Sequence, residues 1–105
     1  MLDRLRSLIR TGRYRLTLHA EQERDADEVS INEIEAAFSG PEAEAVEDYP
    51  DDPRGHSVLI LGFTEAGEPL HAVWSIHENT AILITIYRPD PRLWTDWRKR
   101  KGAPP

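Results

Sequence analysis

The chain has no cysteine among its 105 residues, so it can form neither a disulfide nor a thiolate metal site. It also lacks long apolar runs. No segment approaches the ~20 apolar residues that cross a bilayer, and residues 1–10 carry charges where a secretory leader would carry its apolar core. These absences predict a cytoplasmic protein with a single domain over residues 1–101, followed by a disordered tail over residues 102–105.

Positive charge is missing from the middle of the chain, although the net charge is only −6. Residues 19–54 carry thirteen acids against two arginines, and residues 55–87 carry no lysine or arginine. By contrast, residues 1–18 carry five arginines against one aspartate, and residues 88–105 carry six bases against two acids. If the basic ends meet in space, they form a patch that attracts phosphate. The alternative is that opposite charges face each other or the solvent.

The first half of the chain predicts three helices and a strand. Apolar residues recur at helical spacing over residues 2–9, and alternation over residues 14–18 predicts a strand with one basic face. Residues 19–27 are rich in glutamate and alanine and favour a helix. A capping box that begins at Ser30 predicts a further helix over residues 31–39.

The second half predicts an antiparallel sheet. Residues 45–49 are extended, and residues 57–63 are continuously apolar, which is typical of a strand covered on both faces. Short connections lead to strands over residues 69–77 and 81–87. Two prolines then end the last strand, and the aromatic, basic segment 93–101 predicts a C-terminal helix. The fold class is therefore α+β, with helices packed on a sheet of four to five strands.

Several motifs in this order resemble one family, an uncharacterised bacterial family with the RelE/ParE-like toxin fold. The resemblance spans residues 14–100. Members resemble messenger-RNA endoribonucleases that act with or without the ribosome, and some are paired with a small zinc-ribbon, helix-turn-helix antitoxin. The resemblance thus implies a toxin-like protein whose partners are an antitoxin, messenger RNA or the ribosome. The motifs are Leu18-His19-Ala20, the Ser30 capping box, Glu47-Asp48-Tyr49-Pro50-Asp51-Asp52, Leu61-Gly62-Phe63, Pro69-Leu70-His71, and Tyr87-Arg88-Pro89-Asp90-Pro91 followed by Trp94.

Metal-independent cleavage of RNA needs a base, an acid and a cation. Alternation along two successive strands allows His71 and Tyr87 to be neighbours, and Arg88 follows directly as a cation. We therefore predict His71, Tyr87 and Arg88 as the catalytic set. Each has a structural alternative: His71 as a half-buried histidine that donates to a carbonyl, Tyr87 as a core residue, and Arg88 as a partner of Asp48, of Asp90 or of the end of a helix.

Other side chains are candidates for holding RNA through charge or stacking. Trp94 and Trp97 would share one face of the predicted C-terminal helix, and they could instead dock that helix on the sheet. His19 could instead pair with Glu23, four residues on. Many similar proteins carry arginines where this chain has Glu23 and Asp27, which weakens the expected hold on phosphate. The predicted RNA-binding residues are His19, Arg24, Arg92, Trp97 and Arg98.

No metal site and no cofactor are predicted. His19 and Glu23 have helical spacing, but the second histidine of a zinc-protease motif is missing. Two classes of function remain. The first is an RNA-directed endoribonuclease of toxin type. The second is a non-catalytic module on the same scaffold, in which the acidic helices and residues 42–52 bind a basic protein.

Overall fold

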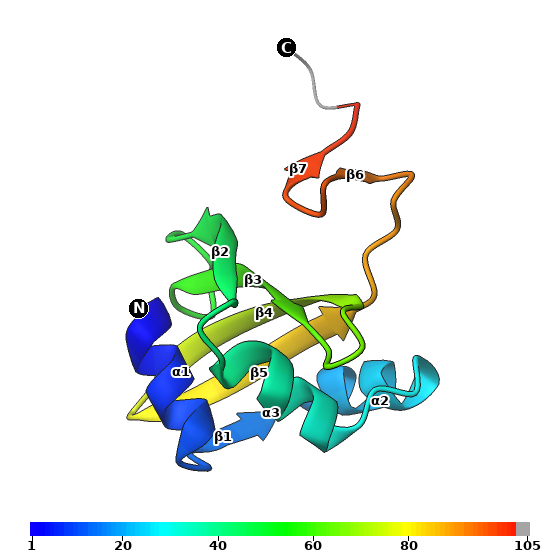
Figure 1. Ribbon diagram of the computed structural model, residues 1–105. Helices are drawn as coiled ribbons and strands as arrows, with labels where there is room; N and C mark the ends of the chain where they lie inside the picture. The colour runs from blue at the N-terminus through cyan, green and yellow to red at the C-terminus, as the bar shows by residue number, and fades with distance from the viewer. Residues whose placement is uncertain (103–105) are drawn as a thin grey trace.

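The computed structural model describes residues 1–102 and is built on a five-stranded sheet with the order β1-β5-β4-β3-β2 (Figure 1). Strands β2 to β5 are antiparallel, as predicted, but β1 is parallel to β5. No hairpin links β1 and β5, so the connection leaves their relative direction free. The strands are β1 Tyr14–Leu16, β2 Glu44–Tyr49, β3 Ser57–Phe63, β4 Pro69–His77 and β5 Thr80–Tyr87.

Three helices precede β2: α1 Leu2–Arg10, α2 Leu18–Ala26 and α3 Ile31–Ser39. The predicted capping box of α3 is confirmed, with Ser30 and Glu33 each accepting a backbone N–H at 3.0 Å. The strand predicted to reach Leu18 stops earlier, because the Thr17 hydroxyl accepts the Ala20 N–H and starts α2. Within residues 1–102, none of the helices is long and apolar enough to cross a membrane.

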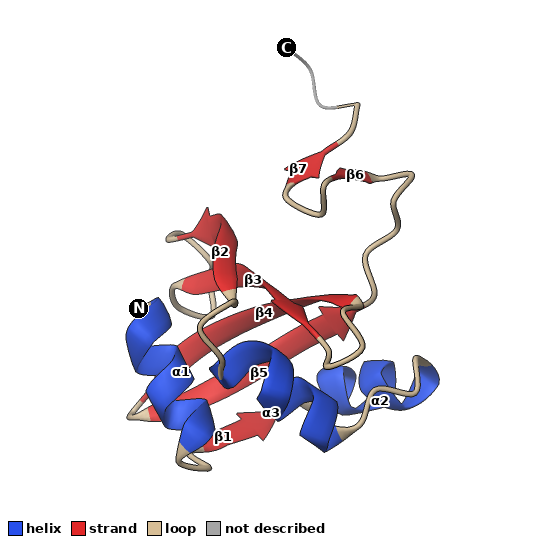
Figure 2. Cartoon of the chain, in the orientation of Figure 1, coloured by secondary structure: helices blue, strands red, loops and turns tan. Residues whose placement is uncertain are grey.

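The core lies between the sheet and helices α1 and α3 (Figure 2). Trp74 is completely buried at its centre, as predicted, and the rings of Tyr14 and Phe38 meet it edge-on at 6.3 and 5.8 Å. Helix α3 lies so close to β3 that a Cβ atom on Gly62 would stand 2.5 Å from the Ala37 carbonyl oxygen. Glycine is therefore required where these two elements cross.

The second face of the sheet, here called the open face, has no helix comparable to α1 or α3 over it. Alternation places Leu59, Leu61, His71, Val73 and Ser75 on this face. Leu59 and Leu61 are nonetheless at most 1% exposed. The C-terminal segment stands on this side of the sheet (Figure 2), so the open face is only partly accessible.

The predicted C-terminal helix is wrong: the segment forms a hairpin of β6 Trp94–Thr95 and β7 Lys99–Arg100. Asp96 and Trp97 have φ of +53° and +61°, and the Arg98 N–H reaches the Thr95 carbonyl at 3.0 Å. These are features of a type I′ turn, which no helix can contain. Trp94 and Trp97 consequently share no helical face. Of the predicted disordered tail, Gly102 is described as part of a turn, and residues 103–105 lie outside the described residues.

Candidate functional site

His71 and Tyr87 are neighbours on the open face, as predicted. They are paired across β4 and β5, their rings meet edge-on with centroids 5.3 Å apart, and His71 Nδ1 lies 3.1 Å from the Tyr87 hydroxyl. His71 is completely buried rather than half-buried, whereas Tyr87 is partly exposed. The histidine is thus an internal residue that reaches the surface only through its tyrosine partner.

The hydrogen bonds fix the proton on His71. Its Nε2 lies 2.7 Å from the Trp97 carbonyl oxygen, which can only accept, so Nε2 carries the proton. Nδ1 therefore accepts from the Tyr87 hydroxyl. Burial lowers the pKa of His71 and raises the pKa of Tyr87, which keeps the imidazole and the phenol neutral.

A ring of charged and aromatic groups surrounds this pair. Arg100 binds Glu47 through two hydrogen bonds of 2.9 and 3.0 Å and lies 4.7 Å from the centre of the Trp94 ring. Trp94 in turn meets the His71 ring edge-on at 4.5 Å. The charges of Glu47 and Arg100 act in opposite directions on the pKa of His71. The cation close to the pair is therefore Arg100, which the sequence did not single out.

Arg88 does not join His71 and Tyr87. Its side chain turns towards the connection after α2, where Nε donates to the Asp27 carbonyl oxygen at 3.4 Å. Its Nη1 forms an ion pair with Glu68 at 3.5 Å rather than with Asp48 or Asp90. Alternation explains this, because consecutive residues of an extended chain point to opposite sides. The structure thus assembles two members of the predicted catalytic set and separates the third.

His19 lies beside the same end of the sheet, paired with Glu23 at 3.3 Å and with 69% of its side chain exposed. Glu23 also accepts the Thr85 hydroxyl at 2.5 Å and the Ile86 backbone N–H at 3.0 Å. Strand β1 ends at Leu16, so Glu23 supplies the acceptor that a longer strand would have given β5. Glu23 is therefore a structural residue here.

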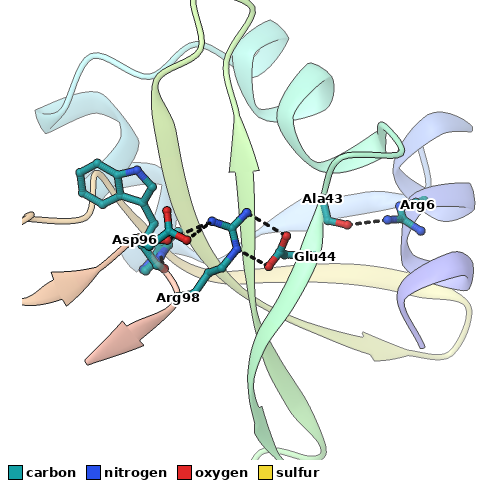
Figure 3. A network of polar contacts seen from close by, with 7 residues as sticks. Arg6, Ala43, Glu44, Asp96 and Arg98 are labelled. Carbon is teal, nitrogen blue, oxygen red and sulfur yellow. Dashed lines mark hydrogen bonds and ion pairs between the residues drawn. The ribbon is translucent and has the colours of Figure 1, made fainter. Parts of the chain in front are cut away.

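The remaining predicted RNA-binding residues are mostly engaged within the protein. Arg24 pairs with Glu21 and donates to the Val29 carbonyl oxygen at 3.3 Å, and Arg92 forms a bidentate pair with Asp90. Trp97 is partly buried in the turn. Arg98 lies between Glu44 and Asp96 (Figure 3), with a bond of 2.6 Å to Glu44.

The basic ends do not combine into one patch. At the C-terminal end, Arg98 and Arg100 neutralise Glu44 and Glu47 of β2. At the N-terminal end, Arg6 donates to the backbone carbonyls of Gly40, Pro41 and Ala43, and the Ala43 contact is drawn in Figure 3. At the C-terminal end opposite charges thus face each other, which is the second of the two arrangements considered from the sequence.

One part of the open face remains cationic, a groove of about 260 Å³ at the end of the sheet away from the hairpin. We call it the open-face groove. Its parts come from β1, β4, β5 and the loop before β3, so no single segment of the sequence reveals it. The alternation of Arg13 and Arg15, which gives the first strand a basic face, is the signal that the sequence does contain. Its lining residues are Arg15, Thr17, Arg54, Ser75, His77, Ile82 and Ile84.

A larger cavity of about 400 Å³ lies between α3 and the turn after β3. The ionisable residues of its lining are the glutamates Glu33 and Glu65; the lining residues include no histidine, lysine or arginine, although the charge of Arg88 acts on Glu33 from nearby. In residues 1–102, no three histidine or acidic side chains gather as a metal site would require. This cavity therefore offers no acid–base pair, and the open face is the better candidate for a functional surface.

The fold and the buried pair define an α+β protein whose mostly antiparallel sheet carries histidine and tyrosine on its open face. Residues 16–88 match the family model described as Domain of unknown function (DUF4258). The match covers more than half of the chain, so the chain belongs to this family. No curated protein and no solved structure matches it. The matched region runs from the last residue of β1 through β5 and leaves out α1 and the C-terminal hairpin.

Proposed function

We propose that the chain is an RNA-directed protein of bacterial toxin type that cleaves messenger RNA without a metal ion. The resemblance described above suggests the activity, and the hydrogen bond between His71 and Tyr87 on the open face is the observation that carries it. A neutral buried imidazole is a base, and a partly exposed phenol is its route to a substrate.

In this proposal the Tyr87 oxygen takes the proton of the ribose 2′-hydroxyl while its own proton passes to His71 Nδ1. The 2′-oxygen then attacks the phosphorus, and the bond to the 5′-oxygen breaks to leave a cyclic phosphate. Glu47 stabilises the resulting imidazolium, because its charge already favours protonated His71. His19, held by Glu23 and exposed, is the acid that protonates the 5′-oxygen. Arg100 supplies positive charge near Tyr87.

The experiment is induced expression in a bacterial host, following growth and messenger-RNA integrity together. Tyr87→Phe and His19→Gln should each abolish growth arrest and RNA loss, with a melting temperature within a few degrees of the wild type. Tyr14→Phe and His56→Gln are matched controls, since they remove a phenol on the helix side of the sheet and an exposed histidine paired with Asp48. Arrest that persists in Tyr87→Phe would exclude this mechanism.

One observation favours the alternative, a non-catalytic module that binds a basic protein. His71 is completely buried, and both of its ring nitrogens already have partners. In that case the wild-type chain would leave growth and RNA intact while remaining soluble.

The toxin proposal requires a partner, a zinc-ribbon, helix-turn-helix antitoxin. Co-expression of that antitoxin should restore growth.

A further inference from the structure

The open-face groove carries one arginine, Arg15, whose charge is not neutralised by an acidic side chain within residues 1–102. Arg15 projects from the edge strand β1 and is exposed, and across residues 1–102 it forms no ion pair and no side-chain hydrogen bond. Arg54 is neutralised by Asp52, which it binds through Nε and Nη2, but within residues 1–102 the N–H groups of Nη1 have no partner. His77 adds an exposed imidazole on the same rim, 4.0 Å from the carboxylate of Glu78. The rim therefore offers donors to an anion.

A serine hydroxyl lies beside these cations. Ser75 is only 9% exposed and lines the groove, and in the described part of the chain its hydroxyl has no hydrogen-bond partner. Its oxygen is not among the buried unpaired side-chain atoms, so it is accessible from the groove and can donate to a group that enters there. By contrast, the Thr17 hydroxyl is already used, since it donates to the Ile84 carbonyl oxygen at 2.9 Å.

The floor of the groove is apolar. Ile82 and Ile84 are each 7% exposed and line the groove with hydrocarbon. The same strand continues to Tyr87, and five residues of β5 from Ile82 span about 16 Å. A chain that places a phosphate on the rim and a base on the floor would therefore reach Tyr87 within a few nucleotides.

We infer that the open-face groove binds the phosphodiester backbone of single-stranded RNA. Arg15, Arg54 and His77 contact phosphate oxygens, Ser75 donates its hydroxyl proton, and Ile82 with Ile84 supports a ribose or base. This inference rests on the proposed function, because it places the RNA that Tyr87 would cleave. Unlike the proposed cleavage, RNA binding in the groove requires no catalytic step, so a binding measurement alone tests it.

The test measures binding of a short, fluorescein-labelled single-stranded RNA of mixed sequence by fluorescence anisotropy. Arg15→Gln should weaken binding about tenfold, which is the usual effect of losing one charge-assisted hydrogen bond. The slope of log affinity against log salt should also become shallower by about one. Arg10→Gln is the matched control, because it removes the same charge from α1 on the opposite side of the sheet. Circular dichroism and melting temperature check that both variants fold.

If Arg15→Gln and Arg10→Gln bind RNA with equal affinity and equal salt slope, the inference that RNA binds in the groove is wrong. The proposed function would still be open to its own test. RNA that binds in the groove but is not cleaved in cells would support the groove and contradict the nuclease. A wild-type chain that binds no RNA overturns both proposals. Ser75→Ala gives a second measure, with an expected loss of several-fold in affinity at an unchanged salt slope.

Discussion

Glu23 shows how an acidic side chain on a helix can complete the edge of a strand. It accepts two hydrogen bonds from β5 at the point where β1 has ended. A carboxylate is suited to this place because it has only acceptors and the unpaired strand edge presents donors. Glu23 thus completes the sheet at a position where a base would leave these donors without an acceptor.

We expect Glu23→Ala to lower the free energy of unfolding by about 1–3 kcal/mol, because the Ile86 N–H and the Thr85 hydroxyl lose their acceptor. Glu23→Gln keeps an acceptor oxygen and should cost less. Urea denaturation measures both. Asp25→Ala, exposed on the same helix, should stay within about 0.5 kcal/mol of the wild type. Equal losses for the alanine and glutamine variants would contradict this role.

His71 should make the stability of the protein depend on pH. Burial lowers its pKa below the ordinary value of 6.5, so the unfolded chain takes up a proton that the folded chain refuses. The free energy of unfolding should therefore be highest above pH 6.5 and fall as the pH drops below it, by at most about 1.4 kcal/mol per pH unit. The charged groups that face the imidazole are Glu47 and Arg100.

The measurement is urea denaturation at several values between about pH 7.5 and about pH 5. His71→Gln keeps an N–H that can reach the Trp97 carbonyl but cannot titrate, so its stability should change less over this range. Tyr87→Phe retains the buried imidazole and should keep the wild-type dependence. If the free energy of unfolding of His71→Gln changes with pH as much as that of the wild type, the pH dependence comes from other groups.

At the level of elements, the contact between α3 and β3 leaves no room for a side chain at Gly62. A methyl group there would meet the Ala37 carbonyl at 2.5 Å and the Phe38 ring at 3.0 Å. Gly62→Ala should therefore displace α3 and lower the free energy of unfolding by about 1–3 kcal/mol. Gly40→Ala is the control, since its nearest contact is an ordinary 3.5 Å. Thermal denaturation compares the two, and similar melting temperatures would contradict the predicted crowding.

Elements fixed by local chemistry could be predicted from the sequence. The capping box of α3 and the tight turn at Glu78 and Asn79 each depend only on residues that are close in the sequence. Both residues of the turn adopt positive φ, as this type of turn requires. The pairing of His71 with Tyr87 does not follow from alternation and that short turn alone, because the regular register counted from the turn would pair His71 with Ile86. A register shift between Val73 and Trp74 moves the partner by one residue to Tyr87, and no local pattern marks that shift. Alternation also places Arg88 away from the pair, a consequence that the predicted catalytic set ignored.

The C-terminal hairpin could not be predicted in this way. Tryptophan rarely adopts positive φ, so Trp97 gives no local signal of a turn, and the many basic residues nearby favour a helix end. The segment is instead held by distant groups: Trp97 accepts from His71, and Arg98 binds Glu44. Partners separated by 26 and 54 positions leave no trace in local periodicity.

For the molecule as a whole, the separation of charge along the sequence is resolved in space. The acidic middle supplies β2, the basic end supplies the hairpin, and they meet through Glu44 with Arg98 and Glu47 with Arg100 (Figure 3 shows the first pair). The arginines are 40% and 57% exposed, so solvent screening limits each pair to about 1 kcal/mol or less. The hairpin should thus be attached by weak, salt-sensitive contacts added to the burial of Trp94.

Reversing one pair tests this attachment. In Glu47→Arg the new side chain repels Arg100, so the amides of residues 93–101 should exchange hydrogen faster than in the wild type, as measured by mass spectrometry. Combining Glu47→Arg with Arg100→Glu restores opposite charges and should recover about 1 kcal/mol or less of the lost protection, with less recovery at 1 M salt. Glu78→Arg makes the same charge change in the turn between β4 and β5 and should leave the hairpin protected. A doubly reversed chain as labile as Glu47→Arg alone would mean that Trp94 and the His71 hydrogen bond hold the hairpin without help from charge.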